Sequence, residues 1–213
     1  MIRLVERFAT NLALHFDLLI LGVYFLYPLE TKQTVLIEMI IGLVGRARSG
    51  KDTVALLVAQ LKPWYQIRRI AQPVKDSLKS LYGWDNRHIE GPFKEVIDPY
   101  VNKSPRQAMI ETAERVKRES GQDFFIKMLL DTWDGKDLVI PDVRFQNEID
   151  AIRKYGGVLV KINRKSCSAF VSEDHIDELV TDYTVQNTSL PSLHSQVADV
   201  LESVNLECEP DEK

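Results

Sequence analysis

Residues 45–53 of the chain, GRARSGKDT, have the composition and spacing of a loop that binds phosphate groups. They follow an apolar run at 40–44 and precede a stretch with helical periodicity, so the loop is expected between a strand and a helix. Such a loop turns successive backbone N–H groups toward one point at the positive end of the helix, where an anion is favoured. Lys51 would then reach the β- and γ-phosphates of a nucleotide. The residues predicted to contact the phosphates are Gly45, Arg48, Ser49, Gly50, Lys51, Asp52 and Thr53.

The position after Lys51 departs from the strict pattern of this loop, which has Ser or Thr there to bind Mg²⁺. This chain has Asp52 instead, and a carboxylate is also a good Mg²⁺ ligand, directly or through water. Thr53 is left to bond a phosphate oxygen. The alternative is a glycine turn with an incidental lysine, but the strand, the spacing, the lysine and the helix all agree with phosphate binding.

A second candidate group is Asp142-Val143-Arg144, with Glu148 one helical turn further on. The apolar run at 138–141 ends directly before Asp142, and ligands of open parallel sheets bind beyond the carboxyl ends of the strands. Asp142 is therefore predicted to hold Mg²⁺ or its waters, and Arg144 to stabilise a phosphoryl group during transfer. Glu148 would orient the Arg144 guanidinium or accept hydrogen bonds from a substrate. The alternative is an N-capping Asp142 beside a surface Arg144–Glu148 pair, which would be worth little energetically.

Two further basic residues lie at predicted helix starts, where an anion is already favoured. Arg106 is in the first turn of the helix that begins at Ser104-Pro105, and Lys75 follows Pro73 at the start of another. Both are predicted to bind the phosphate of a second substrate. The alternative for each is an ordinary solvated side chain.

These residues need a framework, and the chain from Met39 onward predicts an α/β fold with a parallel sheet covered by helices, because short apolar runs alternate with segments of helical period. The predicted strands are 40–44, 65–70, 138–141, 158–162 and 183–186. The predicted helices are 52–61, 73–83, 122–133, 146–155 and 172–179, with two more that begin at 104 and near 193. The irregular segment 84–103 contains the breakers Gly91-Pro92 and Asp98-Pro99. One domain over 39–204, followed by an acidic tail at 205–213, is the economical reading.

Composition limits the partners of the chain. The 27 Lys and Arg against 31 Asp and Glu give a net charge of −4, so no overall basic field favours nucleic acid. Cys167 and Cys208 lie far apart and form no metal or redox pair, which favours a reducing, cytoplasmic location. The four histidines show no metal-ligand spacing, and His175 is expected to have a capping or surface role. The Asn187-Thr188-Ser189 sequon has no meaning in a cytosolic protein.

The N-terminal extension, residues 1–38, contains an apolar run at 12–27. A membrane helix needs about 20 apolar residues, whereas this run is shorter and contains His15 and Asp17. We expect that the sequence starts too early and that the residues before Met39 are not part of the working protein. The alternative is a membrane anchor, and both interpretations stay open.

The chain resembles the phage-type deoxynucleoside monophosphate kinases. The resemblance is carried by GRARSGKDT, AQPVKDSL, SPRQ, IPDVRFQNEIDAIRKYGG and SEDHIDEL, which occur in the order of that family between Met39 and Val204. It implies a three-layer, adenylate-kinase-like P-loop kinase fold with a five-stranded parallel sheet. It also implies ATP- and Mg²⁺-dependent phosphorylation of a deoxynucleoside monophosphate (dNMP), and a possible homodimer.

By matched motif, the resemblance assigns roles to single residues. Lys51, Asp52 and Thr53 would serve ATP and Mg²⁺, and the residues that would serve the acceptor and the transferring phosphoryl group are Arg106, Asp142, Arg144 and Glu148. We further expect a lid between Asn163 and Glu178 that closes over the phosphates and carries Arg164 and Lys165.

Two alternative functions remain. One is a P-loop kinase for another small acceptor, such as dephospho-coenzyme A or phosphomevalonate. The other is a nucleotide-binding module, tethered to a membrane by the apolar N-terminus, that transfers no phosphate. A second phosphate site formed by Arg106 and Arg144 would argue against a pure binding module.

Overall fold

The structure is a computed structural model that describes residues 39–165 and 171–207. The chain divides into two units, Met1–Ile37 and Glu38–Lys213, and the described residues all lie in the second unit. The predicted N-terminal extension with its apolar run therefore lies outside the described residues, as does the tail after Glu207. Among the helices that are described, none combines the length and the apolar character needed to cross a membrane.

A five-stranded sheet forms the centre of the fold, and its strands pair in parallel in the order β2-β3-β1-β4-β5. The strands are β1 (Ile40–Val44), β2 (Gln66–Ile67), β3 (Leu138–Val143), β4 (Val158–Asn163) and β5 (Tyr183–Gln186). The central strand β1 is buried along its whole length, which is typical of a parallel sheet covered on both faces. The predicted P-loop kinase fold is confirmed by this sheet, and the loop predicted to bind phosphate follows its central strand directly.

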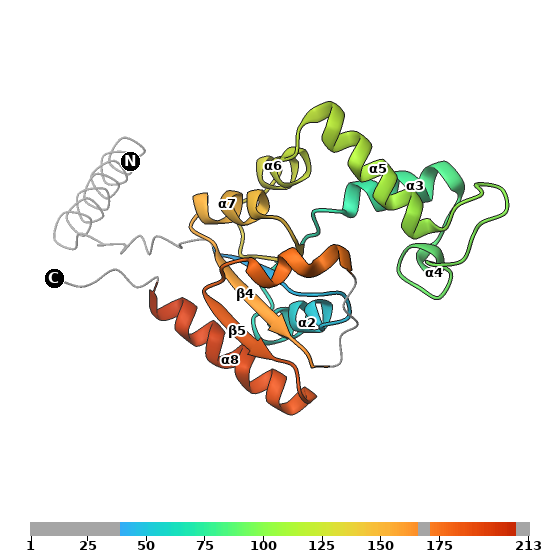
Figure 1. The fold of residues 1–213 in the computed structure, drawn as a ribbon. Helices are drawn as coiled ribbons and strands as arrows, with labels where there is room; N and C mark the ends of the chain where they lie inside the picture. Colours follow the sequence, from blue (N-terminus) through green and yellow to red (C-terminus); the bar gives the residue numbers. More distant parts are fainter. Residues whose placement is uncertain (1–38, 166–170, 208–213) are drawn as a thin grey trace, which may run out of the picture. The chain divides into compact units, whose positions relative to one another are not determined.

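Helices cover both faces of the sheet and give the fold three layers (Figure 1). Alternate β1 side chains point to opposite faces, so Ile41 and Leu43 belong to one core cluster and Ile40 and Val44 to the other. The first cluster is closed by α2 (Lys51–Leu61) and α8 (Leu190–Glu207). The second is closed by α6 (Phe124–Asp131) and α7 (Gln146–Lys154).

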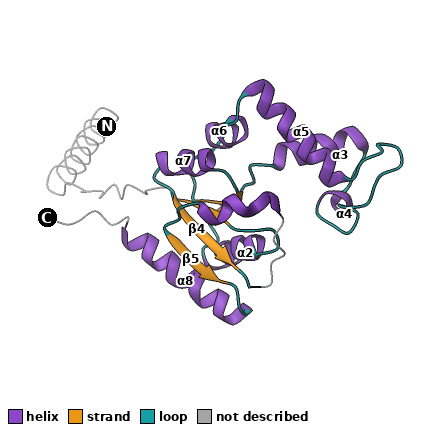
Figure 2. Cartoon of the chain, in the orientation of Figure 1, coloured by secondary structure: helices purple, strands orange, loops and turns teal. Residues whose placement is uncertain are grey.

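Three more helices, α3 (Gln72–Tyr82), α4 (Asn86–Ile89) and α5 (Pro105–Ser120), lie together in Figures 1 and 2. Ser104 caps α5 as the sequence predicted, because its side chain accepts from the Gln107 N–H while the Gln107 side chain accepts from the Ser104 N–H. Gly83 ends α3 in the left-handed conformation, also as expected. The stretch Val171–Glu178 forms a 3-10 helix, η1.

Several boundaries differ from the sequence-based prediction. Strand β3 continues through Asp142 to Val143, so Asp142 lies within the strand rather than just after it. Strand β2 is shorter than predicted, because the chain turns after Ile67 toward Asp142. The irregular segment 84–103 contains the short helix α4, and α8 extends to Glu207, into the predicted tail.

Candidate active site

The loop between β1 and α2 has the backbone geometry of a phosphate cradle. Gly50 is the N-cap of α2 with a φ of 104°, and Arg48 has a φ of 62°. Left-handed backbone at a residue other than glycine is sparsely populated and is retained mainly where the surrounding structure imposes it. The first N–H groups of α2 have no acceptor within the helix and face the loop, where an anion can accept from them. The seven residues predicted to contact the phosphates therefore lie together in this loop and the first turn of α2.

Lys51 lies over the loop. Its Nζ donates to the carbonyl oxygens of Gly45 at 2.6 Å and Arg46 at 2.9 Å. These bonds hold the ammonium group at the loop, where its charge is available to a phosphate. The Ser49 hydroxyl is buried, and no described residue is its hydrogen-bond partner.

Asn187 directly follows the edge strand β5 and supports the loop between β1 and α2. Its Nδ2 donates to the Ser49 carbonyl at 2.8 Å, and its backbone N–H donates to Asn163 at 2.7 Å. A Cβ on Gly50 would lie 2.3 Å from that Nδ2, so a side chain at position 50 would displace Asn187 as well as strain the backbone. The sequence around Asn187 indicated only a glycosylation sequon.

The 3-10 helix η1 contacts both the loop between β1 and α2 and the segment Asp142-Val143-Arg144, called the DVR segment below. The Arg46 guanidinium donates to Asp177 at 2.8 Å and holds the pKa of that carboxyl below its usual value. His175 stacks on the Phe145 ring, and its Nε2 lies 3.1 Å from the Arg144 carbonyl oxygen. His175 is exposed, in agreement with the expected capping or surface role, and its ring also contacts the segment that bears Arg144.

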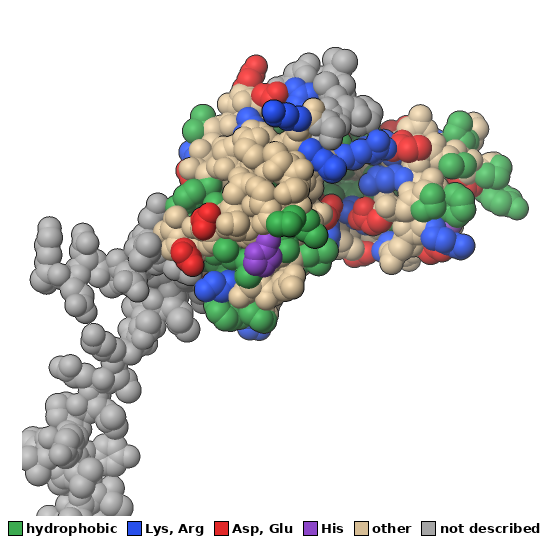
Figure 3. All heavy atoms as spheres, turned by 90° about the horizontal axis from the view of Figure 1, so that it is seen from below, with side chains coloured by type: hydrophobic (Ala, Val, Ile, Leu, Met, Phe, Trp, Pro, Cys, Tyr) green, Lys and Arg blue, Asp and Glu red, His purple; other side chains and the backbone are tan. Residues whose placement is uncertain are grey.

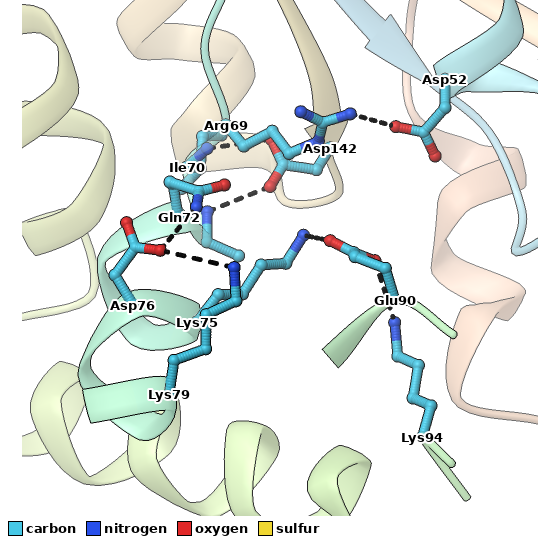
Figure 4. Close-up of polar contacts among 11 residues, drawn as sticks. Asp52, Arg69, Ile70, Gln72, Lys75, Asp76, Lys79, Glu90, Lys94 and Asp142 are labelled. Carbon is cyan, nitrogen blue, oxygen red and sulfur yellow. Dashed lines mark hydrogen bonds and ion pairs between the residues drawn. The ribbon is translucent and has the colours of Figure 1, made fainter. Parts of the chain in front are cut away.

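The predicted metal-binding carboxylates Asp52 and Asp142 both contact the segment that joins β2 to α3, Asp52 through the Arg69 side chain and Asp142 through the backbone (Figure 4). Asp52 Oδ1 accepts from the Arg69 guanidinium at 2.8 Å. Asp142 accepts from the backbone N–H groups of Ile70 at 2.9 Å and Ala71 at 3.0 Å, one on each carboxylate oxygen. Asp142 thus fixes the start of α3 beside the loop, and Arg69 is a site residue that the sequence did not indicate.

The donor set suits Mg²⁺ held with nucleotide phosphates better than a cage made of protein alone. No group of three or more His, Cys, Asp or Glu residues that could hold a metal occurs in the described part of the chain. Mg²⁺ usually keeps several waters and binds one or two carboxylates together with substrate phosphates. Asp52, whose side chain is 75% exposed, and Asp142 fit that requirement.

A hollow of about 290 Å³ lies beyond the carboxyl end of β3 and collects the other predicted site residues. Its lining includes every residue predicted to serve the acceptor, namely Lys75, Arg106, Asp142, Arg144 and Glu148. It also includes Lys94, Lys117 and Phe145, which the sequence analysis missed. Apolar side chains from α5 and α6, such as Met109 and Phe125, complete the wall. On the face drawn in Figure 3, Lys and Arg side chains lie beside Asp and Glu side chains around a hollow in the surface.

Glu148 fixes the main chain from which Arg144 projects. Its Oε2 accepts from the N–H groups of Arg144 at 2.7 Å and Phe145 at 3.1 Å. Lys117 Nζ lies 4.0 Å from the centroid of the Phe145 ring. Burial raises the pKa of Glu148, although the two backbone donors limit the rise. Glu148 thus contacts Arg144 through the main chain, and the guanidinium contact predicted for Glu148 stays a prediction.

Glu148→Gln is expected to change how stability depends on pH. Because burial raises the folded pKa of Glu148 above its ordinary value of 4.5, its contribution to stability is present below that pH and is lost as the pH rises through the folded pKa. Gln can accept both backbone bonds but does not titrate. The Tm of the wild type relative to Glu148→Gln should therefore fall as the pH rises above 4.5. Glu119→Gln, at an exposed residue paired with Arg115, should show no such trend, and a rising difference for Glu148→Gln would contradict the burial argument.

A second hollow of about 220 Å³ lies beside the phosphate-binding loop, and the predicted lid contributes to it. Its lining includes Gly45, Ser49, Arg164 and Lys165. The Arg164 guanidinium approaches the Arg48 carbonyl oxygen at 3.5 Å. Residues 166–170 of the predicted lid lie outside the described residues, so the lid stays a prediction.

Comparisons with known proteins agree with the motifs. No protein-family model matches the chain. The chain is 24% identical over 192 residues to the protein "Putative deoxynucleotide monophosphate kinase" of Acanthamoeba polyphaga mimivirus, an alignment that covers 78% of this chain and 98% of the relative.

Similar solved structures are more remote. A protein of Thermus thermophilus, TT1252, is 13% identical with a TM-score of 0.48, over 78% of this chain and 97% of that chain. Shikimate kinase of Aquifex aeolicus is 16% identical with a TM-score of 0.44, over 79% and 98%. Dephospho-CoA kinase of Campylobacter jejuni is 12% identical with a TM-score of 0.42, over 79% and 98%. The resemblance to the deoxynucleoside monophosphate kinases that the motifs indicate is confirmed by the mimivirus relative, which bears that name and aligns over most of the chain.

Proposed function

We propose that this chain is a kinase that transfers the γ-phosphoryl group of ATP to the phosphate of a deoxynucleoside monophosphate, in the presence of Mg²⁺. The observation that carries the proposal is the hollow of about 290 Å³ beyond the carboxyl end of β3, which has cations along its wall and an apolar remainder. Its volume is close to the lower end of the range for small-molecule sites. The name of the mimivirus relative supports the same acceptor class.

The place of the hollow supports direct transfer between two bound nucleotides. Val44, which leads into the loop, pairs with Val143, which follows Asp142 and precedes Arg144. The donor phosphates on the loop and an acceptor phosphate near Arg144 would therefore meet at the carboxyl edge of two adjacent strands. An attacking phosphate oxygen is already ionised, so the reaction requires no strong general base.

The proposed work of the protein is positioning and charge neutralisation. Lys51 would hold the β- and γ-phosphates, and the planar Arg144 guanidinium would follow the phosphoryl group as its charge shifts. Asp142 fixes the start of α3 through Ile70 and Ala71, and so keeps Lys75 next to the acceptor. Mg²⁺, held at Asp52 and Asp142, would neutralise charge on the donor phosphates.

The alternative functions differ in the second ligand. A kinase for dephospho-coenzyme A or phosphomevalonate would use the same loop with another acceptor. A nucleotide-binding module would have no use for a second cationic hollow, so Lys75, Arg106 and Arg144 favour a transferase. The cytoplasmic location, the homodimer and the absence of a nucleic-acid partner remain predictions.

The test is ADP production by the purified full chain with ATP, Mg²⁺ and each dNMP in turn. We expect turnover that depends on at least one dNMP and exceeds ATP hydrolysis without an acceptor by at least about tenfold, because a kinase must exclude water from the phosphoryl group. Dephospho-coenzyme A and phosphomevalonate serve as rival acceptors. Turnover with a rival alone would move the proposal to that acceptor, and ATP binding without turnover on any acceptor would favour the binding module.

A further inference from the structure

The hollow of about 290 Å³, called the acceptor hollow below, has three basic residues that pair with carboxylates from one segment of the chain, namely Lys75, Lys94 and Arg106. Glu90 Oε1 lies 2.5 Å from Lys75 Nζ, and Glu90 Oε2 lies 3.6 Å from Lys94 Nζ. Glu95 Oε1 accepts from the Arg106 Nε at 2.5 Å. Both glutamates belong to the irregular segment between α3 and α5, and Figure 4 shows Glu90 between the ammonium ends of the two lysines.

The cations lie deeper than their partners. The Lys75 and Lys94 side chains are 13% and 26% exposed, whereas the Glu90 side chain is 50% exposed. The three cations line the hollow, but neither glutamate is among its lining residues. The carboxylates therefore lie at the rim, and their charge satisfies basic groups that face inward.

The pKa values of Lys94 and Glu90 are shifted by the charges around them, as expected when Lys75, Lys94 and Arg106 lie close together. Burial lowers the pKa of Lys94, and the charges of Arg106 and Lys75 add to the effect, while Glu90 opposes it. Burial also raises the pKa of Glu90, but the hydrogen bond from Lys75 and the charges of Lys75, Lys94 and Arg69 outweigh it. The net pKa of Glu90 is lowered, so this carboxylate is ionised and acts as the counter-ion of the group near neutral pH.

A phosphate has the chemistry to replace these carboxylates. It offers three acceptor oxygens and up to two negative charges, and it forms strong charge-assisted bonds with Lys and Arg. An ion pair with an exposed partner contributes little, so its loss on exchange is small. Each glutamate can turn outward into solvent, whereas the buried lysine stems cannot leave the hollow without losing their packing.

From this geometry we infer that Glu90 and Glu95 are internal counter-ions that compete with the acceptor phosphate for Lys75, Lys94 and Arg106, and so set the charge that an acceptor needs in order to bind. The inference rests on the proposed function, because it assumes that the acceptor phosphate lies at these cations. A phosphate dianion displaces the carboxylates. A nucleoside without phosphate leaves them in place and binds only through its sugar and base.

The test is the double variant Glu90→Gln/Glu95→Gln in the full chain, with binding of each dNMP, of its nucleoside and of inorganic phosphate measured by titration calorimetry. Gln keeps the shape and removes the competing charge. We expect the double variant to bind the dNMP and inorganic phosphate about 3- to 10-fold more tightly, as expected for the removal of one or two partly exposed ion pairs. The affinity for the nucleoside should be unchanged. The matched control is Glu111→Gln, which removes the exposed partner of Lys103 on α5 and should alter no affinity.

A second variant keeps the inference testable if the first is ambiguous. In a Lys94→Met background, Glu90→Gln should tighten phosphate binding by a smaller factor than in the wild-type background, because one of its two cations is gone. An equal factor in both backgrounds would overturn the competition, and so would unchanged or weaker dNMP binding in the double variant.

The inference and the proposed function can fail separately. Tighter phosphate binding without transfer to any dNMP would support the counter-ions and refute the acceptor. Transfer to a dNMP with no change of affinity in the double variant would support the kinase and refute the counter-ions. A wild-type chain that binds neither a dNMP nor inorganic phosphate would also refute the proposed role of the two glutamates as counter-ions.

Discussion

Arg144→Ala is expected to lower kcat by about 10³-fold, the size of effect found when an arginine that stabilises a transferring phosphoryl group is removed. Arg144 directly follows strand β3 and lines the acceptor hollow. Its role is to follow charge that develops during transfer, so kcat and kcat/KM for the dNMP should fall together. Steady-state kinetics with ATP and the preferred dNMP would measure both.

The fold should tolerate this change. The contacts from Arg144 to Glu148 and His175 use its backbone N–H and carbonyl oxygen, which alanine retains. The Tm should therefore shift by no more than about 2–4 °C. Arg115→Ala is the matched control, because its side chain is 73% exposed and pairs with Glu119 one turn along α5. A loss of less than about tenfold in kcat would contradict the role proposed for Arg144.

Lys51→Ala is expected to lower kcat by about 10²- to 10³-fold and to raise the KM for ATP. The ammonium group lies over the loop through its bonds to Gly45 and Arg46, so it is in place before the nucleotide arrives. Its removal takes a positive charge from the donor phosphates in both the bound state and the transition state. Kinetics in ATP and ATP titration of the variant would separate the two effects.

The control for Lys51→Ala is Lys136→Ala, an exposed lysine that pairs with Asp134 before strand β3. That variant should retain the kcat and the KM of the wild type. Lys51→Ala with wild-type kcat would show that the loop binds phosphate without assisting transfer. Such a result would favour the binding module over the kinase.

Local features of the sequence predicted much of the fold. The capping box depends on two residues three positions apart, Ser104 and Gln107, so its pattern can be recognised along the chain. The loop at 45–53 and the DVR segment were predicted for the same reason, because each acts through consecutive residues after a buried strand. The acceptor hollow brings together Lys75, Arg106 and Arg144. The sequence indicated that they lie together only because each could bind a phosphate group.

The missed residues act through contacts that join distant segments. Asn187 supports the loop through Ser49, which lies 138 positions earlier in the chain, and nothing near Asn187 in sequence indicates it. Lys94 lies in a segment with breakers and no period, so the sequence could not show that its side chain enters the hollow. Asp142 was predicted as a metal ligand because of its residue type and its place at the end of a strand, but its bonds to Ile70 and Ala71 depend on the neighbouring strand.

The short helix η1 contacts the predicted phosphate-binding loop at Arg46 through Asp177, and it contacts the segment that bears Arg144 through His175. One element thus contacts the surroundings of both proposed ligands. If ATP favours one position of η1, the acceptor that prefers the same position binds more tightly by some factor. Thermodynamic reciprocity then requires the acceptor to raise the affinity for ATP by that same factor, so the order in which the two nucleotides bind would not alter the total free energy of the ternary complex.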